Sequence, residues 1–353
     1  MKVTLAALAA LFAAGVSANP LLAKRATKCN GYSQLCNKQY SNVTYVGAHN
    51  SYAVGQTSNS AANQNVNVTT QLNDGVRLLQ IQGHTYGNSG SGISLCHTSC
   101  ALYNGGTLED YMKNVTSWLD ENKNDVVTII ISNPSDIDVS KWAQGIQSAG
   151  LNRYAYTSDS GSVDRDNWPT LQNMISQNKR VVIFMDRKTD ISQTNFILPE
   201  FNNIWENPYD QRSLPFNCTA DRYNRTPSKL MYLHNNVIDK EQSLLGQTFS
   251  VPNTDNLTNT NSYEVVYDAV NSCAKQHNYY PTFILVDYYN IGGGGPLQAA
   301  AKMNGVQYDN STLSSSESST GSSATAGALA MLPPHAAFAT TLALCVAFIL
   351  STA

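Results

Sequence analysis

The stretch Val126-Val127-Thr128-Ile129-Ile130-Ile131, followed by the polar pair Ser132-Asn133, decides the fold. It is apolar and β-branched almost without interruption, which is typical of a strand buried on both faces of a parallel sheet. The same pattern, an apolar run ending in a polar residue, recurs at Val43–Ala48 before His49-Asn50, Ile93–Cys96 before His97, Val181–Met185 before Asp186-Arg187-Lys188, Leu230–Leu233 before His234, and Phe283–Val286 before Asp287.

Helical segments are expected between these runs. The candidates are Leu108–Leu119, Trp142–Ala149, Trp168–Gln177 and Ser262–Gln276. Strands that alternate with helices predict an α/β fold, a distorted (β/α) barrel of the TIM type, whose polar residues gather at the carboxyl ends of the strands. A doubly wound open sheet has the same local pattern and remains the alternative. Gly292–Gly295 lacks the Lys-Ser/Thr of a phosphate loop and is expected to form a turn.

One further strand is expected at Gly75–Gly83. Side chains alternate along a strand, so Gln80 and Gln82 face one side and Arg77 faces the other. We therefore expect a structural role for Arg77. His84 follows the glutamines on their side and is a weaker candidate for the pocket, and His277 is expected at the surface.

The two ends of the chain carry targeting signals. Residues 1–18 have the short apolar core and small terminal residues of a secretory signal peptide, and 19–25 ends in Lys24-Arg25 as a possible pro-segment. The single barrel domain is expected over 26–305 and a Ser/Thr-rich linker over 306–335. The apolar tail 336–353 has no basic residue after it, which favours a glycosylphosphatidylinositol (GPI) attachment signal over a tail-anchored helix.

Composition narrows the possible partners and the compartment. The chain has 353 residues, 42% of them hydrophobic and 13% charged, and a net charge of −3, which excludes a basic footprint for nucleic acid. Seven Asn-X-Ser/Thr sequons begin at Asn42, Asn67, Asn114, Asn217, Asn224, Asn256 and Asn310. We expect a secreted glycoprotein at the outer face of the plasma membrane or in the cell wall, with a GPI anchor.

Six cysteines lie outside the tail, an even number that favours disulfides in an oxidising compartment. Six cysteines allow 15 connectivities. Sequence proximity favours Cys29–Cys36 and Cys96–Cys100, which leaves Cys218–Cys273. A zinc site is the rival interpretation, but the spacing of cysteines and histidines does not fit one.

A set of motifs in order makes the sequence resemble a known family. They are Gly47-Ala48-His49-Asn50-Ser51-Tyr52, Leu72-Asn73-Asp74-Gly75-Val76-Arg77, Leu95-Cys96-His97, Thr107-Leu108-Glu109, Arg180–Asp186 and Asp287-Tyr288-Tyr289-Asn290-Ile291-Gly292. Together they resemble the X domain of phosphatidylinositol-specific phospholipase C, above all the secreted fungal phospholipase-C-like phosphodiesterases. The resemblance runs from about Cys29 to about Lys302.

The resemblance implies a distorted barrel and a reaction with two histidines. One imidazole takes the proton of the attacking hydroxyl and another protonates the leaving alkoxide. By position, His49 is the general base, His97 the general acid and Asp287 the residue that orients His49. In the family the inositol 2-hydroxyl attacks phosphorus, giving a cyclic phosphate and diacylglycerol. The implied partner is a phospholipid or inositol-phosphate head group.

This chain departs from the family where charge is needed. Signalling members hold calcium with carboxylates and an Asn like Asn50, and bacterial members use an arginine instead. Here the corresponding positions are Gln80, Gln82 and Ser132, so we expect no metal and no cofactor, calcium included. The proposed substrate-binding residues are Asn50, Gln80, Gln82, Asp186, Arg187 and Lys188.

Three function classes remain open on the sequence. The first is a phosphoric diester hydrolase of the phospholipase C type that acts on a lipid head group. The second is a catalytically weak or inactive binding glycoprotein that retains the pocket, and the third is a structural wall glycoprotein. The paired histidines favour the first class over the third.

Overall fold

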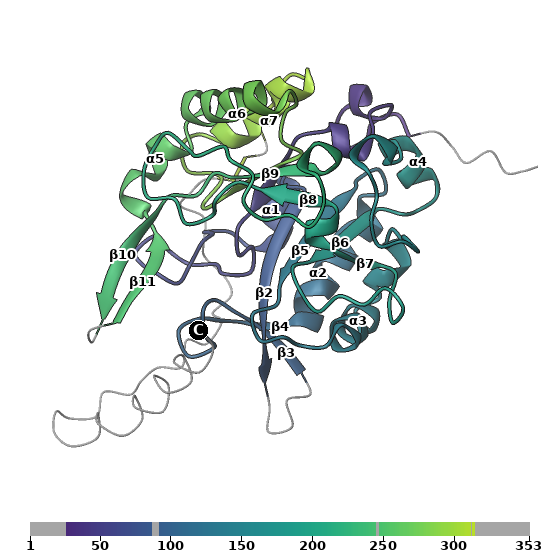
Figure 1. The fold of residues 1–353 in the computed structure, drawn as a ribbon, viewed down its shortest axis with the longest axis horizontal. Helices are drawn as coiled ribbons and strands as arrows, with labels where there is room; N and C mark the ends of the chain where they lie inside the picture. The colour runs from purple at the N-terminus through teal and green to yellow at the C-terminus, as the bar shows by residue number, and fades with distance from the viewer. Residues whose placement is uncertain (1–25, 87–91, 245–246, 312, 315–353) are drawn as a thin grey trace, which may run out of the picture. The chain divides into compact units, whose positions relative to one another are not determined.

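Eight parallel strands form the centre of the protein (Figure 1). The computed structural model describes residues 26–86, 92–244, 247–311 and 313–314, all within one compact unit. The pairing order is β7–β6–β5–β2–β1–β12–β9–β8. In chain order the bounds are β1 Tyr45–Ala48, β2 Leu78–Tyr86, β5 Val127–Ser132, β6 Val181–Met185, β7 Ile197–Pro199, β8 Ile204–Glu206, β9 Met231–Asn235 and β12 Phe283–Val286.

The two strands at the ends of this order, β7 and β8, are joined by a short connection and therefore lie near each other. Only Glu200–Asn203 separate the last residue of β7 from the first residue of β8, a step of at most about 18 Å. Leu198 of β7 and Ile204 of β8 also belong to the same buried cluster. The sheet therefore curls into a distorted barrel, with no pairing between β7 and β8 among the described residues. The barrel prediction is confirmed, because a doubly wound sheet would hold these strands at opposite edges.

Helices cover the outside of the curled sheet. Figure 1 shows α6 beside α7 on one side and α2 and α3 on the other. The bounds are α1 Val68–Asn73, α2 Leu108–Glu121, α3 Val139–Ser148, α4 Leu171–Ser176, α5 Leu257–Thr260, α6 Tyr263–His277 and α7 Gly295–Asn304. Thr107 caps α2 by accepting from the backbone N–H of Asp110, as its spacing indicates.

The glycine run before α7 is only partly a turn. Gly292, Gly293 and Gly294 have left-handed φ angles of 88°, 70° and 73°. Gly295 already begins α7, so the prediction of a turn over all four glycines is wrong at its last residue. The helix follows at once because Pro296 suits a first helical turn and alanines come next.

One predicted strand runs against the others. Residues Gly92–Cys96 form β3, which is antiparallel to β2 and pairs with the short β4 (Asn104–Thr107). β2 extends beyond its parallel partners, and β3 returns along it so that Leu95 lies opposite Gly83. This hairpin brings the end of β3 back to the carboxyl-end face of the barrel.

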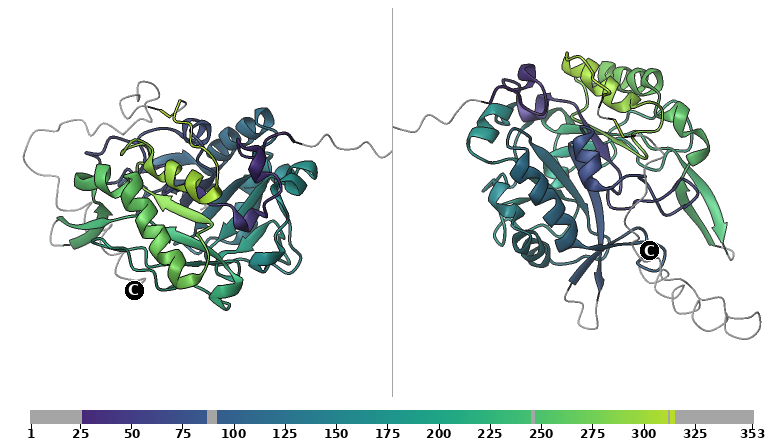
Figure 2. Two further views of the ribbon diagram at one scale, coloured as in Figure 1. Left: turned by 90° about the horizontal axis from the view of Figure 1, so that it is seen from above. Right: turned by 180° about the vertical axis from the view of Figure 1, so that it is seen from behind.

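The sequence pattern missed an antiparallel ribbon, β10 (Asp239–Leu244) with β11 (Gln247–Pro252). It stands apart from the barrel sheet and is seen from two further directions in Figure 2. Its residues are mostly polar and exposed, so no apolar period marks it.

All three expected disulfides are formed: Cys29–Cys36, Cys96–Cys100 and Cys218–Cys273. The expected signal peptide, pro-segment and apolar tail lie outside the described residues. The start of the expected linker contacts the barrel, since Ser314 donates from its backbone N–H and hydroxyl to Asp74. In the part of the chain that the structure describes, no helix is long and apolar enough to cross a bilayer.

Candidate active site

His49 and Asp287 are adjacent because their strands are adjacent. β1 and β12 pair in a register that places Ala48 opposite Val286. His49 and Asp287 directly follow these two residues and therefore lie side by side at the carboxyl ends of the strands. His49 Nδ1 lies 2.8 Å from Asp287 Oδ1. The carboxylate is almost wholly buried, and the histidine is half-buried. The structure thus brings together the expected base and the residue expected to orient it.

His97 faces His49 from the loop between β3 and β4. The two imidazole centroids are 6.5 Å apart with planes at 73°. His97 Nδ1 lies 2.9 Å from the carbonyl oxygen of Ala61, and the Cys96–Cys100 disulfide closes the short loop that follows β3. Both rings are held through Nδ1, so an exchange of protons with a substrate takes place at Nε2, which in His49 also lies 3.2 Å from Asn50 Nδ2.

Gln80 and Gln82 hold the loops that carry the histidines. Gln80 Oε1 accepts from the backbone N–H of Asn50 at 2.7 Å, and Gln82 Oε1 accepts from the backbone N–H of Thr98 at 2.9 Å. Asn50 and Thr98 both have positive φ angles, 39° and 60°. Each loop therefore turns sharply at the residue whose backbone N–H donates to a glutamine.

Asn50 contacts His49 directly. Its Nδ2 lies 3.2 Å from His49 Nε2, and the side chain is buried. With the Nδ1 proton of His49 donated to Asp287, the amide of Asn50 donates to the bare Nε2.

The two histidines have pKa values shifted in opposite directions. Burial lowers the pKa of His49, but the charge and hydrogen bond of Asp287 outweigh it, so the pKa is raised overall. Burial lowers the pKa of His97, and the hydrogen bond to Ala61 offsets this only in part. His49 is therefore the stronger proton acceptor and His97 the stronger proton donor.

The end of β6 carries the other expected binding residues. Asp186 accepts from the backbone N–H of Asn133 at 2.9 Å, and burial raises its pKa. Arg187 Nε lies 3.3 Å from Asp186 Oδ2, with 55% of its side chain exposed. Lys188 is exposed. Ser132 ends the neighbouring β5, opposite Gln82.

Sequence patterns did not find several polar residues on this face. Glu206 ends the three-residue β8 and forms an ion pair with Arg222. Burial, together with the nearby charge of Glu206, raises the pKa of Glu200 well above its usual range. Burial and the charge of Asp287 raise the pKa of Asp239, the first residue of the ribbon, to about 6. Asn63, wholly buried, donates to Asp287 at 2.8 Å. Such short strands and loops have no period to recognise.

Other basic candidates have different surroundings. Arg77 binds Asp125 and the carbonyl oxygens of Leu72 and Val76, so the expected structural role is confirmed. His84 lies beside Ser135, with Nδ1 3.1 Å from its hydroxyl. The expectation that His277 lies at the surface holds only in part, because its ring is half-buried against Trp205.

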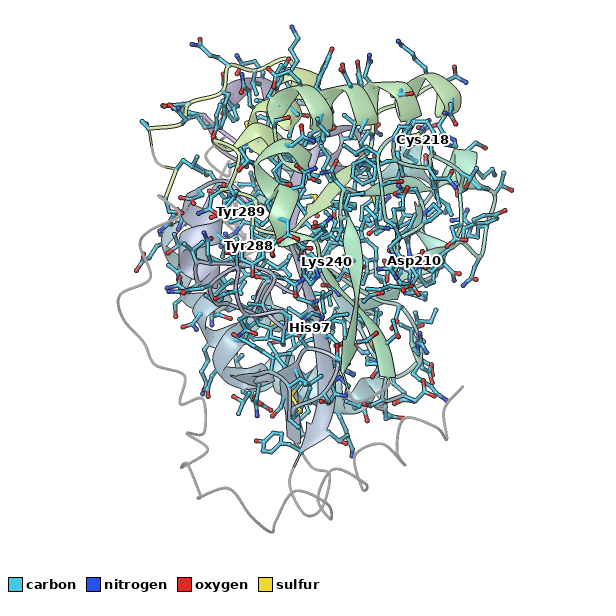
Figure 3. All side chains as sticks on the ribbon, turned by 90° about the vertical axis from the view of Figure 1, so that its left-hand side faces the viewer. His97, Asp210, Cys218, Lys240, Tyr288 and Tyr289 are labelled. Carbon is cyan, nitrogen blue, oxygen red and sulfur yellow. A yellow bond between two sulfur atoms is a disulfide. The ribbon has the colours of Figure 1, made fainter. Side chains whose placement is uncertain are left out.

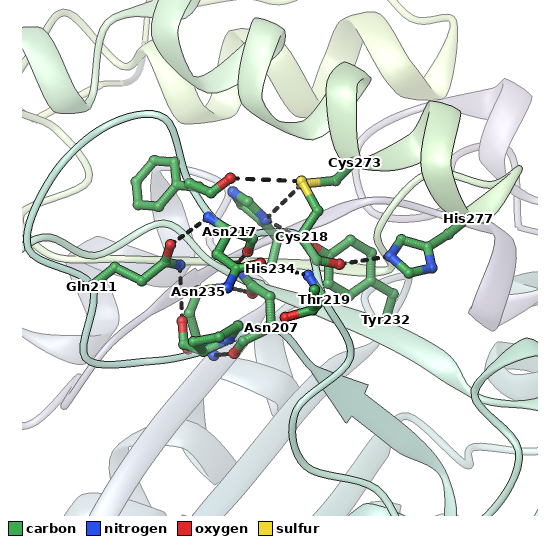
Figure 4. Close-up of a disulfide and its surroundings, with 12 residues drawn as sticks. Asn207, Gln211, Asn217, Cys218, Thr219, Tyr232, His234, Asn235, Cys273 and His277 are labelled. Atoms are coloured by element: carbon green, nitrogen blue, oxygen red, sulfur yellow. Dashed lines mark hydrogen bonds between the residues drawn. A yellow bond between two sulfur atoms is a disulfide. The ribbon is translucent and has the colours of Figure 1, made fainter.

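His234 is wholly buried beside the Cys218–Cys273 disulfide (Figure 4). Its Nδ1 lies 2.6 Å from the Tyr232 hydroxyl and 3.9 Å from Cys273 Sγ. Burial lowers its pKa to about 3. It therefore belongs to the packing around the disulfide.

Comparison with known proteins agrees with the motifs. The family model described as PI-PLC X 1 matches residues 35–304. An uncharacterized secreted protein of Arthroderma benhamiae is 41% identical over 290 residues, which cover 80% of this chain and 65% of that protein. A PI-PLC X domain-containing protein 1 of the same organism is 32% identical over 304 residues, covering 85% of this chain and 96% of the relative.

Solved structures with a similar arrangement include phosphatidylinositol-specific phospholipases C of two bacteria. A mutant of the Staphylococcus aureus protein gives a TM-score of 0.49 at 13% identity, covering 75% of this chain and 94% of that chain. The Listeria monocytogenes protein gives 0.49 at 13%, covering 76% and 95%. Both scores are below 0.5, and the barrel is established by the strand pairing of this chain. The match of the family model over most of the chain, together with the identity to the second Arthroderma relative, shows that this protein belongs to the PI-PLC X domain family.

Proposed function

We propose that the protein is a phosphoric diester hydrolase of the phosphatidylinositol phospholipase C type. The observation that carries the proposal is the facing pair His49 and His97, each held from behind through Nδ1, with ring centroids 6.5 Å apart. A phosphodiester between the two Nε2 atoms can receive a base on one side and an acid on the other.

The proposed reaction moves two protons. His49 Nε2 takes the proton of the inositol 2-hydroxyl while its oxygen bonds to phosphorus. The bond from phosphorus to the diacylglycerol oxygen breaks, and His97 Nε2 gives its proton to that oxygen. The products are a cyclic inositol phosphate and diacylglycerol. Asp287 stabilises the imidazolium that forms on His49.

We propose that this reaction needs no calcium. Calcium prefers several charged oxygen ligands, whereas Gln80, Gln82 and Ser132 are neutral. The side-chain oxygens of both glutamines already accept backbone N–H groups, which leaves each with one lone pair and no net charge to offer an ion. We assign the stabilising positive charge to Arg187, supported by Lys188, since a guanidinium can bind phosphate with two parallel hydrogen bonds.

We also propose that the protein acts outside the cell, anchored by a GPI group attached within the linker. All seven sequon asparagines are exposed, which is compatible with glycans at each position. Deleting residues 336–353 should then release the protein to the medium. Retention of the truncated protein on cells would contradict the anchor.

The test of the activity uses the secreted protein truncated after the linker and vesicles of phosphatidylinositol, with calcium or with a chelator. We expect diacylglycerol and cyclic inositol phosphate in both conditions. His49→Ala and His97→Ala should each lose about 10²–10⁴-fold in rate. His84→Ala is the matched control and should keep the wild-type rate. Stimulation by calcium, or full activity in either catalytic variant, would contradict the proposal.

One observation favours a second candidate, a binding protein without turnover. The positions expected to stabilise charge at the phosphate are amides and a serine, and an amide dipole does this less well than a cation. Inorganic phosphate or inositol phosphate bound at the histidine pair, without cleavage of any phosphodiester, would identify this alternative.

A further inference from the structure

Three consecutive residues of the loop between β1 and α1 connect both histidines. No motif marks Ala61, Ala62 and Asn63, yet all three make hydrogen bonds to the active site or to the residue that follows Asp287. The segment Ala61–Asn63 is thus in contact with elements far from it in the sequence.

Asn63 holds the carboxylate that holds the base. Its Nδ2 donates to Asp287 Oδ1 at 2.8 Å and lies 3.2 Å from His49 Nδ1. Because His49 donates its own Nδ1 proton to the same oxygen, the amide proton goes to Asp287. Asn63 Oδ1 accepts from Asn50 Nδ2 at 3.2 Å, and the asparagine is wholly buried. Two donors on one carboxylate oxygen fix its rotation and hence the plane of the imidazole.

Ala61 holds His97, the proposed general acid, as Asn63 holds Asp287. Its carbonyl oxygen accepts from His97 Nδ1 at 2.9 Å. A carbonyl can only accept, so it fixes a proton on Nδ1. The proton that His97 exchanges with a substrate is therefore the one on Nε2.

The same segment holds the residue after Asp287. Tyr288 donates its backbone N–H to the carbonyl of Asn63 at 2.8 Å and its hydroxyl to the carbonyl of Ala62 at 2.9 Å. Its φ angle is 45°, a left-handed conformation that is strained for a tyrosine and persists only where its surroundings impose it. Ala61–Asn63 therefore makes hydrogen bonds to both Tyr288 and His97, which are labelled in Figure 3.

We propose that Ala61–Asn63 sets the orientation of both catalytic histidines and that Asn63 is the positioning residue for the base. The inference rests on the function proposed above. It adds a link between the two histidines, since one backbone segment fixes the proton-carrying atom of each ring.

A substitution that nearly preserves shape tests Asn63. In Asn63→Asp, the introduced carboxyl donates the same hydrogen bond when protonated and repels Asp287 when ionised. Burial and Asp287 both raise the pKa of such a carboxyl. The other groups acting on Asp287 are His49, His97, Asp239 and Tyr288, all present in wild type and variant. Because these groups are present in both proteins, the ratio of variant to wild-type rate reports what the introduced carboxyl adds, including its effect on their pKa values.

We expect Asn63→Ala to lower kcat about 10- to 100-fold while KM changes less than about twofold, because a small misplacement of a catalytic group costs rate. Asn63→Asp should approach the wild-type rate at acidic pH, with the ratio falling about tenfold or more as pH rises. Tyr288→Phe, which keeps the ring, should lower kcat a few-fold. Asn30→Asp is the matched control: Asn30 is a buried asparagine that holds Val126 before β5, and its ratio should not change with pH.

Nitrogen NMR of the histidines gives a readout independent of turnover. In wild type, neutral His49 should carry its proton on Nδ1, and Asn63→Ala should shift the Nδ1 resonance of His49, because Asp287 loses its second donor, while His97 stays unchanged as the internal control. If the wild type cleaves no phosphodiester, the proposed function fails and the NMR result alone decides this inference. An unchanged Nδ1 resonance of His49 in Asn63→Ala overturns it, as does a ratio for Asn63→Asp that is flat with pH.

Discussion

At the scale of the residue, the opposed pKa shifts of His49 and His97 predict the pH dependence of the rate. A general base works when neutral, so the rate rises as pH passes the raised pKa of His49. Asp287→Asn removes the charge that raises this pKa. The acidic limb of the profile for kcat/KM should then move to lower pH, while kcat falls about 10²-fold or more. Asp110→Asn, at an exposed carboxylate, is the control. An acidic limb that does not move would contradict the role of Asp287.

A second prediction concerns Arg187, the proposed source of positive charge at the phosphate. Arg187 is exposed and bound to Asp186 by a single contact, so it can turn towards an anion at little cost. Arg187→Ala should lower kcat/KM about 10- to 100-fold, or about 1.4–2.8 kcal/mol. Arg187→Lys should recover part of the loss, because it keeps the charge but not the paired hydrogen bonds. Arg153→Ala, at another exposed arginine bound to an aspartate, should have no effect. Equal rates for the wild type and Arg187→Ala would remove Arg187 from the site.

At the scale of the element, the two disulfides with the shortest and longest loops should separate stability from catalysis. Cys96 and Cys100 are four residues apart, and Cys218 and Cys273 are 55 apart. Loop entropy gives about 2 kcal/mol for the short ring and about 4 kcal/mol for the long one. Replacing the short pair by serine should therefore cost less stability but lower kcat about tenfold or more, because it frees the loop of His97. Replacing the long pair should lower the denaturation midpoint more and leave kcat of the folded protein unchanged. The reverse pattern would show that the His97 loop does not need its disulfide.

For the molecule as a whole, the sequence predicts those features that leave a periodic pattern of apolar residues or a recognisable motif. The buried strands and the long helices follow from patterns of apolar residues, and the pair His49 and Asp287 follows from the resemblance of the motifs that contain them. The direction of β3 could not be predicted, because a strand of five residues reads the same in either direction. Asn63 could not be found either, since a loop amide acquires its role only when the fold brings it beside Asp287. Glu206 was missed because its strand has three residues.

The stability of the whole fold should also depend on pH through His234. Its pKa is lowered to about 3 by burial, against about 6.5 in an unfolded chain. Between these values the unfolded state binds one more proton than the folded state, so stability falls as pH decreases, by about 1.4 kcal/mol per pH unit well below 6.5. Urea denaturation between pH 7 and 4.5 should show this slope. His234→Gln cannot be protonated and should flatten it by about that amount, although it lowers stability at pH 7 by disturbing the contact with Tyr232. His84→Ala is the control: burial lowers the pKa of this half-buried histidine as well, but it lies outside this cluster and should flatten the slope less. An equal slope in the wild type and His234→Gln would mean that His234 gains its proton without unfolding, which would contradict its burial as the cause of the low pKa.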